Sequence, residues 1–113
     1  MADIYNGYQF LTPIVGESNY IETLKQLYNH EQSFKQGNSA FVDVTLIHEN
    51  NNPYDNQAVL VMSPLGPIGY LSRQIAREYR QDYPQPFLTV RAKIFSRDNT
   101  MYGVWVDLDY EED

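Results

Sequence analysis

The segment Asn52-Pro53-Tyr54-Asp55 carries the side chains of this chain that are best suited to binding chemistry. Proline fixes its own φ at about −65° and favours an extended Asn52, and Asp55 can cap the turn through the backbone. Tyr54 has no such local role, because a large aromatic residue at a polar loop tip either packs back onto the protein or is offered to a ligand. A tyrosine ring can stack on a nucleobase while the neighbouring carboxylate accepts a hydrogen bond from a sugar hydroxyl. The turn is therefore suited to the end of a nucleotide strand, and its carboxylate would repel a terminal phosphate.

Catalytic groups are scarce in this sequence. It contains no cysteine and only two histidines, His30 and His48, and it has neither a G-x-S-x-G nor an H-E-x-x-H motif. His48, Glu49 and Asp55 could meet in space and bind a metal, although a histidine at the end of a strand is more often a hydrogen-bonded structural residue. We expect a protein without enzymatic activity, metal or cofactor, and keep an enzyme such as a nuclease subunit as the least favoured alternative.

The net charge of −7 argues against binding to nucleic acid, but the charge is unevenly distributed. Six of the eight basic residues lie between Arg73 and Arg97, where only two acidic residues oppose them, which gives this stretch a charge of +4. The last seven residues carry five acids. Arg73, Arg77, Arg91 and Lys93 could follow a phosphate backbone. The alternative is that the basic stretch is ordinary solvated surface and the acidic end a frayed, solubilising terminus.

Hydrophobic periodicity predicts a mainly β, α+β chain with two helices. A helix is expected over about 20–29, with Asn19 and Glu22 as a capping box, and a second helix after the N-cap Ser72. The polar segment 30–39, which contains Gly37-Asn38, is expected to be a loop. Six strands are predicted, with a hairpin formed by the last two: 10–15, 41–48, 58–62, 68–71, 88–95 and 101–108. Short strands in this number favour a small curled sheet or barrel over a parallel α/β sheet.

Three blocks of the sequence carry a family signature. They are Val15-Gly16-Glu17-Ser18-Asn19-Tyr20, Glu49 through Val59 with its N-P-Y-D turn, and Ile68-Gly69-Tyr70-Leu71-Ser72-Arg73. In their order and spacing these blocks resemble the HIRAN family. The resemblance extends from about Val15 through the final hairpin. It implies an OB-like barrel. Together with the six predicted strands, this leads us to expect a small OB-like six-stranded barrel over residues 10–108, preceded by an extension (1–9) and followed by an acidic tail (109–113).

The resemblance also implies a function. Helicase-linked members of that family hold the 3′-hydroxyl end of single-stranded DNA, and their contacts correspond here to Tyr54, Asp55 and Tyr70. A basic residue and an aromatic residue of those members are replaced here by Ser18 and Asn19, with Tyr20 next, and Gln57 stands where asparagine is common. Family members occur alone or fused to helicases and nucleases, which implies a helicase or nuclease as a protein partner and a role in DNA repair or processing.

Together these features predict a module that binds single-stranded DNA or a 3′-hydroxyl strand end. The residues expected to contact the strand are Tyr20, Asn52, Tyr54, Asp55, Tyr70, Arg73, Arg91 and Lys93. The alternative is a non-catalytic protein-interaction module, for which the acidic tail and the ten tyrosines would be suited. We see no signal peptide and no apolar run long enough to span a bilayer, so we expect a cytoplasmic protein that does not contact membranes.

Overall fold

The computed structural model describes residues 8–30 and 34–111, which form seven strands and three helical segments. The helical segments are the 3₁₀ helix η1 (Glu17–Tyr20), α1 (Ile21–Asn29) and α2 (Arg73–Asp82). The strands are β1 (Thr12–Val15), β2 (Phe34–Gln36), β3 (Ser39–Glu49), β4 (Ala58–Ser63), β5 (Gly66–Leu71), β6 (Phe87–Phe95) and β7 (Gly103–Val106). Within these residues, no helix is both long and apolar enough to cross a membrane.

Six of the strands close into an antiparallel barrel. They follow one another in the order β3-β4-β5-β1-β7-β6, and β6 pairs back onto β3 along nine residue pairs, from Ser39 with Phe95 to Ile47 with Phe87. The predicted α+β class and OB-like six-stranded barrel are confirmed. The predicted terminal hairpin is confirmed as well, because β6 and β7 pair antiparallel.

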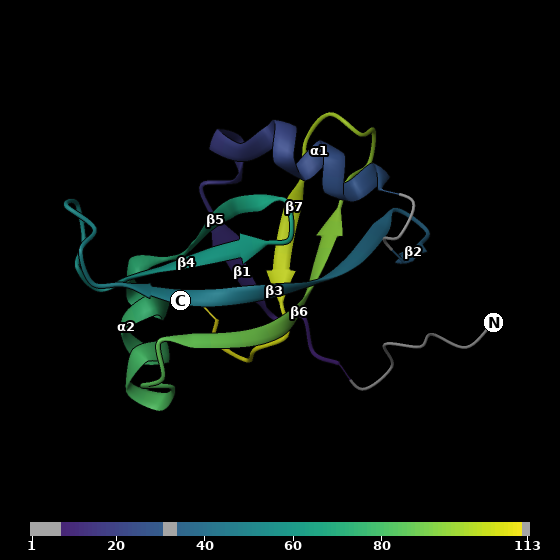
Figure 1. Cartoon of the computed structure of the whole chain (residues 1–113). Coiled ribbons are helices and arrows are strands. Elements are labelled where there is room, and N and C mark those ends of the chain that lie inside the picture. Colours follow the sequence, from purple (N-terminus) through teal and green to yellow (C-terminus); the bar gives the residue numbers. More distant parts are fainter. Residues whose placement is uncertain (1–7, 31–33, 112–113) are drawn as a thin grey trace.

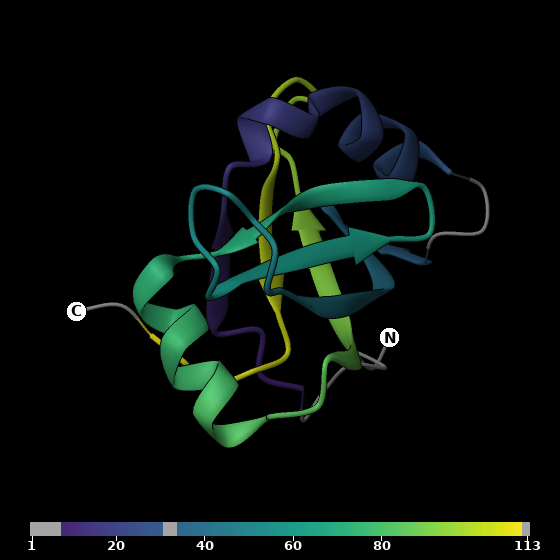
Figure 2. The ribbon, with the colours of Figure 1, turned by 60° about the vertical axis from the view of Figure 1, so that its left-hand side comes forward.

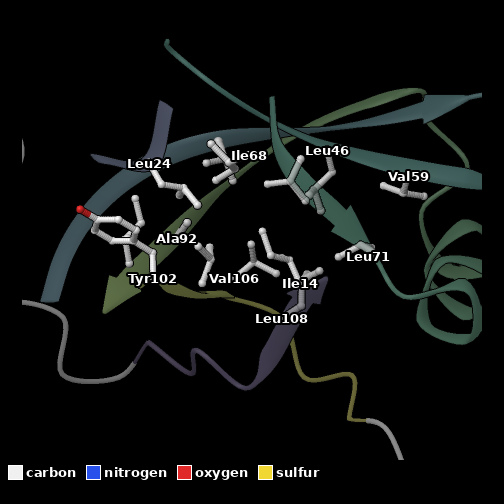
Figure 3. Packing of buried hydrophobic residues seen from close by; sticks show 14 of the residues in the cluster. Ile14, Leu24, Leu46, Val59, Ile68, Leu71, Ala92, Tyr102, Val106 and Leu108 are labelled. Atoms are coloured by element: carbon white, nitrogen blue, oxygen red, sulfur yellow. The ribbon is translucent and has the colours of Figure 1, made fainter. Parts of the chain in front are cut away.

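The barrel is filled by aliphatic side chains that alternate along its strands. Val44 and Leu46 of β3, Ala92 and Ile94 of β6, and Val104 and Val106 of β7 are all buried, as expected for strands with one face toward a core. Figure 3 shows Ile14, Ile68, Leu71 and other labelled members pointing into the same interior.

The two α-helices cover opposite ends of the barrel (Figures 1 and 2). Helix α1 contributes Leu24, Leu27 and Tyr28 to the core, and α2 contributes Ile75, Ala76 and Tyr79. The predicted cap of the second helix is confirmed, since the Ser72 hydroxyl accepts a hydrogen bond from the Ile75 N–H at 3.3 Å. The helix therefore begins directly after β5 and is anchored at the end of the barrel where the β3–β4 loop lies.

Three predictions about the elements were wrong. Residues 34–36, expected to lie in a loop, form β2, which pairs with β3 across the two-residue turn Gly37-Asn38. Residues 31–33 of the expected loop lie outside the described residues. Asn19 does not cap α1, because η1 continues directly into α1 and places Asn19 inside a helical turn. The last strand ends at Val106 rather than at residue 108.

The acidic end of the chain is held against the protein as far as Tyr110. Tyr110 packs against the core, and its backbone N–H and C=O both bond to the buried Thr12 hydroxyl at 2.8 Å. Its hydroxyl also bonds to the Asp82 carboxylate at the end of α2. The tail is therefore tied to β1 and α2, at least as far as Tyr110.

Candidate functional site

Residues 50–57 form a loop between β3 and β4 that projects from one end of the barrel, beside α2 (Figure 1). Asn52 organises this loop. Its Oδ1 accepts hydrogen bonds from the backbone N–H of Tyr54 at 2.8 Å and of Asp55 at 3.2 Å, while its Nδ2 donates to Glu49 Oε1 at 3.0 Å. This is an Asx turn, and it explains why asparagine precedes the proline.

Three tyrosines lie around this loop. Tyr54, at the tip, is 91% exposed, so it does not pack back onto the protein. Tyr70, on β5, is half-buried, and its hydroxyl donates to Glu49 Oε1 at 2.8 Å. Burial, the bond to the Glu49 carboxylate and the neighbouring Tyr20 hydroxyl raise the pKa of Tyr70 to about 12. Tyr70 is therefore a neutral hydrogen-bonding group at physiological pH, and Tyr20 from the end of η1 lies next to it.

Tyr54 and Tyr70 lie between two halves of an open depression, which we call the loop groove. Both halves are lined by Asn52, Tyr54 and Tyr70. The half that we call the acidic side, of about 540 Å³, also contains His48, Glu49, Asn50, Asn51 and Pro53. The half that we call the basic side, of about 450 Å³, also contains Val15, Asn19, Tyr20, Asp55, Ala58, Leu71 and Arg73. Both volumes fall within the range of roughly 300 to 1,000 Å³ that is usual for small-molecule sites.

Asp55 holds two arginines of α2 beside the groove. Its carboxylate lies 3.4 Å from Arg73 Nε and 3.5 Å from Arg77 Nη2, and it accepts a hydrogen bond from the Gln57 N–H at 3.0 Å. That backbone bond and the two guanidinium charges lower the pKa of Asp55. The Arg73 and Arg77 side chains stay 74% and 46% exposed. Asp55 thus positions two cations that can still reach an anion, and its expected role as a hydroxyl acceptor stays a prediction.

Arg80 fastens the base of the loop to α2. Its guanidinium donates to the Gln57 carbonyl at 2.7 Å, to the Ala58 carbonyl at 2.8 Å and to Asn50 Oδ1 at 2.8 Å. These bonds join both ends of the loop to one side chain. The tip of the loop is therefore exposed, but the base is held.

The structure brings together six of the eight predicted site residues: Tyr20, Asn52, Tyr54, Asp55, Tyr70 and Arg73. The other two, Arg91 and Lys93, lie on β6 and line neither side of the groove. Arg91 pairs with Asp43 at 3.2 Å, and Lys93 lies over the Trp105 ring. Asp43 is six residues before Glu49 on β3, which corresponds to about 20 Å of strand. These two cations therefore belong to another part of the barrel surface.

The alternative metal site is not formed. Glu49 is bonded to Tyr70 and Asn52, Asp55 is bonded to the arginines, and His48 packs edge-on against Tyr79 of α2. In residues 8–30 and 34–111, no three histidine or carboxylate side chains gather closely enough to hold a metal ion.

Sequence reasoning missed two residues of the site. Glu49 was considered only as a metal ligand, and Arg80 only as part of the basic stretch. The spacing of Glu49 and Asn52 gives only a weak local signal, since their side chains meet because the chain turns there, with a bond from the Asn52 N–H to the Glu49 carbonyl. Arg80 has no comparable local signal, because its partners lie 22 to 30 residues away.

No protein-family model, curated protein or solved structure matches the chain. The resemblance to the HIRAN family therefore stays a prediction from the sequence.

Proposed function

We propose that this protein is a non-enzymatic module that binds single-stranded DNA, with a 3′-hydroxyl strand end as its preferred target, in the loop groove. The observation that carries the proposal is the meeting of three separate segments, 17–20, 49–57 and 70–77, around one exposed tyrosine. None of these segments could form such a site alone.

The aromatic groups of the groove suit unpaired bases. Tyr54 offers both faces of its ring, and Tyr20 and Tyr70 stand beside it on firmer elements. Stacking on an aromatic side chain contributes roughly 1 to 3 kcal/mol per base and tolerates any base. A duplex hides the faces of its bases, so a single strand or a strand end is the form that this groove fits.

The basic side of the groove suits phosphate. Arg73 and Arg77 extend from the first turns of α2, whose N-terminus adds partial positive charge. Asp55 offsets one of the two charges, and the whole chain carries −7, so we expect affinities no better than micromolar. A module this weak would act beside a partner protein, and a helicase or nuclease engaged in DNA repair or processing is the partner that we propose.

Fluorescence anisotropy with a short 5′-labelled single strand at low salt tests the proposal. We expect saturable binding by the wild type and a loss of roughly fivefold to 150-fold in Tyr54→Ala, which corresponds to one stacked base. Phe95→Ala is the matched control, because Phe95 is also an exposed aromatic residue. It lies on β6 and pairs with Ser39, at the end of β3 that is farthest from the loop.

Absence of binding by the wild type at low salt would refute the proposal. It would favour the alternative, a protein-interaction module that has this fold without a nucleic-acid site. Equal losses in Tyr54→Ala and Phe95→Ala would place binding outside the groove.

A further inference from the structure

The loop groove has opposite charges on its two sides. The basic side carries the guanidinium of Arg73, with Arg77 next to it, and these two charges outweigh the carboxylate of Asp55 that pairs with them; the acidic side carries the carboxylate of Glu49. Tyr54 and Tyr70 stand between them and belong to both sides. A strand bound against these rings would therefore meet a cation on one side and an anion on the other.

Glu49 is fixed in place by the fold. It is the last residue of β3, and its backbone carbonyl accepts a hydrogen bond from the Asn52 N–H at 3.2 Å. Both side-chain donors that it meets, Tyr70 Oη and Asn52 Nδ2, bond to Oε1. Among the hydrogen bonds of the described residues, none uses the second oxygen, Oε2. This oxygen keeps its capacity to accept a hydrogen bond from a ligand.

No cation neutralises Glu49 within the part of the chain that the structure describes. The ion pairs near the loop are those of Asp55 with Arg73 and Arg77, and the Arg80 guanidinium bonds to Asn50 and to two backbone carbonyls instead. The acidic side therefore favours an uncharged hydrogen-bond donor, such as a hydroxyl, and repels a phosphate.

We propose that Glu49 is the residue that determines end specificity in the loop groove: its carboxylate accepts the terminal sugar hydroxyl of a strand and excludes a terminal phosphate. The strand then runs from Glu49 across Tyr54 and Tyr70 toward Arg73, where its first internal phosphate meets the cations. The inference rests on the proposed function, because it concerns the same groove and the same ligand.

The test measures anisotropy with two oligonucleotides that differ only in a 3′-hydroxyl or a 3′-phosphate, each at low and at high salt. The wild type is expected to bind the hydroxyl end about tenfold more tightly at low salt, because a like charge at the site opposes the phosphate. This ratio should shrink as salt screens the repulsion. Glu49→Gln keeps the shape and an acceptor for Tyr70 and Asn52 but removes the charge, and should bring the ratio close to one.

Two control variants separate charge from structure. Tyr70→Phe removes a hydrogen bond to Glu49 and keeps the carboxylate charge, so the preference for the hydroxyl end should persist. Arg73→Ala should weaken binding to both ends by a similar factor and leave their ratio unchanged.

The outcomes distinguish the inference from the function on which it rests. A wild type that binds both ends equally, or a ratio that does not change with salt, would overturn the role of Glu49 and leave single-strand binding in place; the salt comparison needs no variant to fold. A folded Glu49→Gln that still prefers the hydroxyl end would do the same. A wild type that binds neither oligonucleotide would overturn the proposed function itself.

Discussion

At the scale of single residues, Asn52 controls the geometry of the loop, because its amide group joins three partners at once. It accepts from two backbone N–H groups of the tip and donates to Glu49 at the base. An alanine at this position would leave the N–H groups of Tyr54 and Asp55 without their acceptor. The tip would then lose its fixed relation to Tyr70 and Arg73.

We predict that Asn52→Ala lowers the free energy of unfolding by about 1 to 2 kcal/mol, since a net hydrogen bond contributes roughly 0.5 to 1.5 kcal/mol. It should also weaken binding of single strands. The exposed loop residue Asn56, which lines neither side of the groove, gives a matched control, and Asn56→Ala should change neither quantity. Urea denaturation and anisotropy on the same samples would check this, and equal stability of the two variants would contradict the role assigned to Asn52.

His48 makes the stability of the fold depend on pH. Burial, followed by the charge of Arg80, lowers the pKa of His48 below its ordinary value of 6.5. As the pH falls below that value, the unfolded chain takes up a proton that the folded chain binds less readily, so stability falls with pH. This loss of stability is complete once the pH lies below the pKa of His48 in the folded state. The neutral side chain is thus the form that the fold stabilises.

Urea denaturation at about pH 8 and about pH 5 measures this dependence. We expect lower stability at the acidic pH in the wild type and a smaller difference in His48→Gln. An unchanged difference in His48→Gln would assign the pH dependence to other groups.

The residues of the site were predictable to different extents. Tyr54 stood out because a large aromatic side chain among polar turn residues has no local explanation, and it is exposed in the structure. Arg91 and Lys93 were grouped with Arg73 by proximity in sequence. Position along the chain does not indicate which side of a barrel a strand occupies, and β6 carries them away from the loop.

At the scale of elements, a bulge in the pairing of β4 with β5 decides where Tyr70 points. Ile68 and Leu71 are both buried although they are three residues apart, because the register between β4 and β5 shifts by one residue between Val61 and Met62. Such a bulge re-aims the side chains around it. Tyr70 is thereby left on the outer face, toward the loop groove.

Gly69 lets β1 approach this bulge. Its φ is +152°, and a Cβ atom there would lie 2.6 Å from the Val15 carbonyl oxygen and 2.8 Å from Ile14 Cδ1. We predict that Gly69→Ala lowers the free energy of unfolding by about 2 to 4 kcal/mol, from overpacking and backbone strain together. Gly66→Ala is the matched control on the same strand, with φ of +129° and open space around the added carbon. Equal losses in thermal unfolding would show that steric contact with β1 contributes nothing.

The elements themselves were largely predictable from periodicity, with errors where a local signal had two interpretations. Gly37-Asn38 was taken as part of a loop, but a two-residue segment of this type is also typical of a hairpin turn, and it joins β2 to β3. Asn19 and Glu22 have the spacing of a capping box. That spacing does not distinguish the first turn of an α-helix from a 3₁₀ turn that precedes it.

At the scale of the whole molecule, the charge of −7 opposes any polyanionic ligand. The effect is long-ranged at low salt and is screened within about 10 Å at 0.1 M ionic strength. The acids at the end of the chain contribute to this charge. Truncation at Val106 would be a poor way to remove them, since Leu108 is buried and Tyr110 packs against the core.

Neutralising the last three residues by Glu111→Gln, Glu112→Gln and Asp113→Asn changes the charge from −7 to −4 and keeps Tyr110. We predict a gain of a few fold in affinity for single strands at low salt that disappears at high salt. Anisotropy at several salt concentrations checks this. A loss of affinity in the neutralised variant would contradict a purely electrostatic role of the tail.

Binding of single-stranded DNA in the loop groove can be tested most directly by an NMR titration of the ¹⁵N-labelled protein with a short single strand at low salt. We predict shifts of the amide signals that concentrate in residues 17–20, 49–57 and 70–77, with small changes along β6. Shifts centred on β6, or no shifts at any strand concentration, would contradict it.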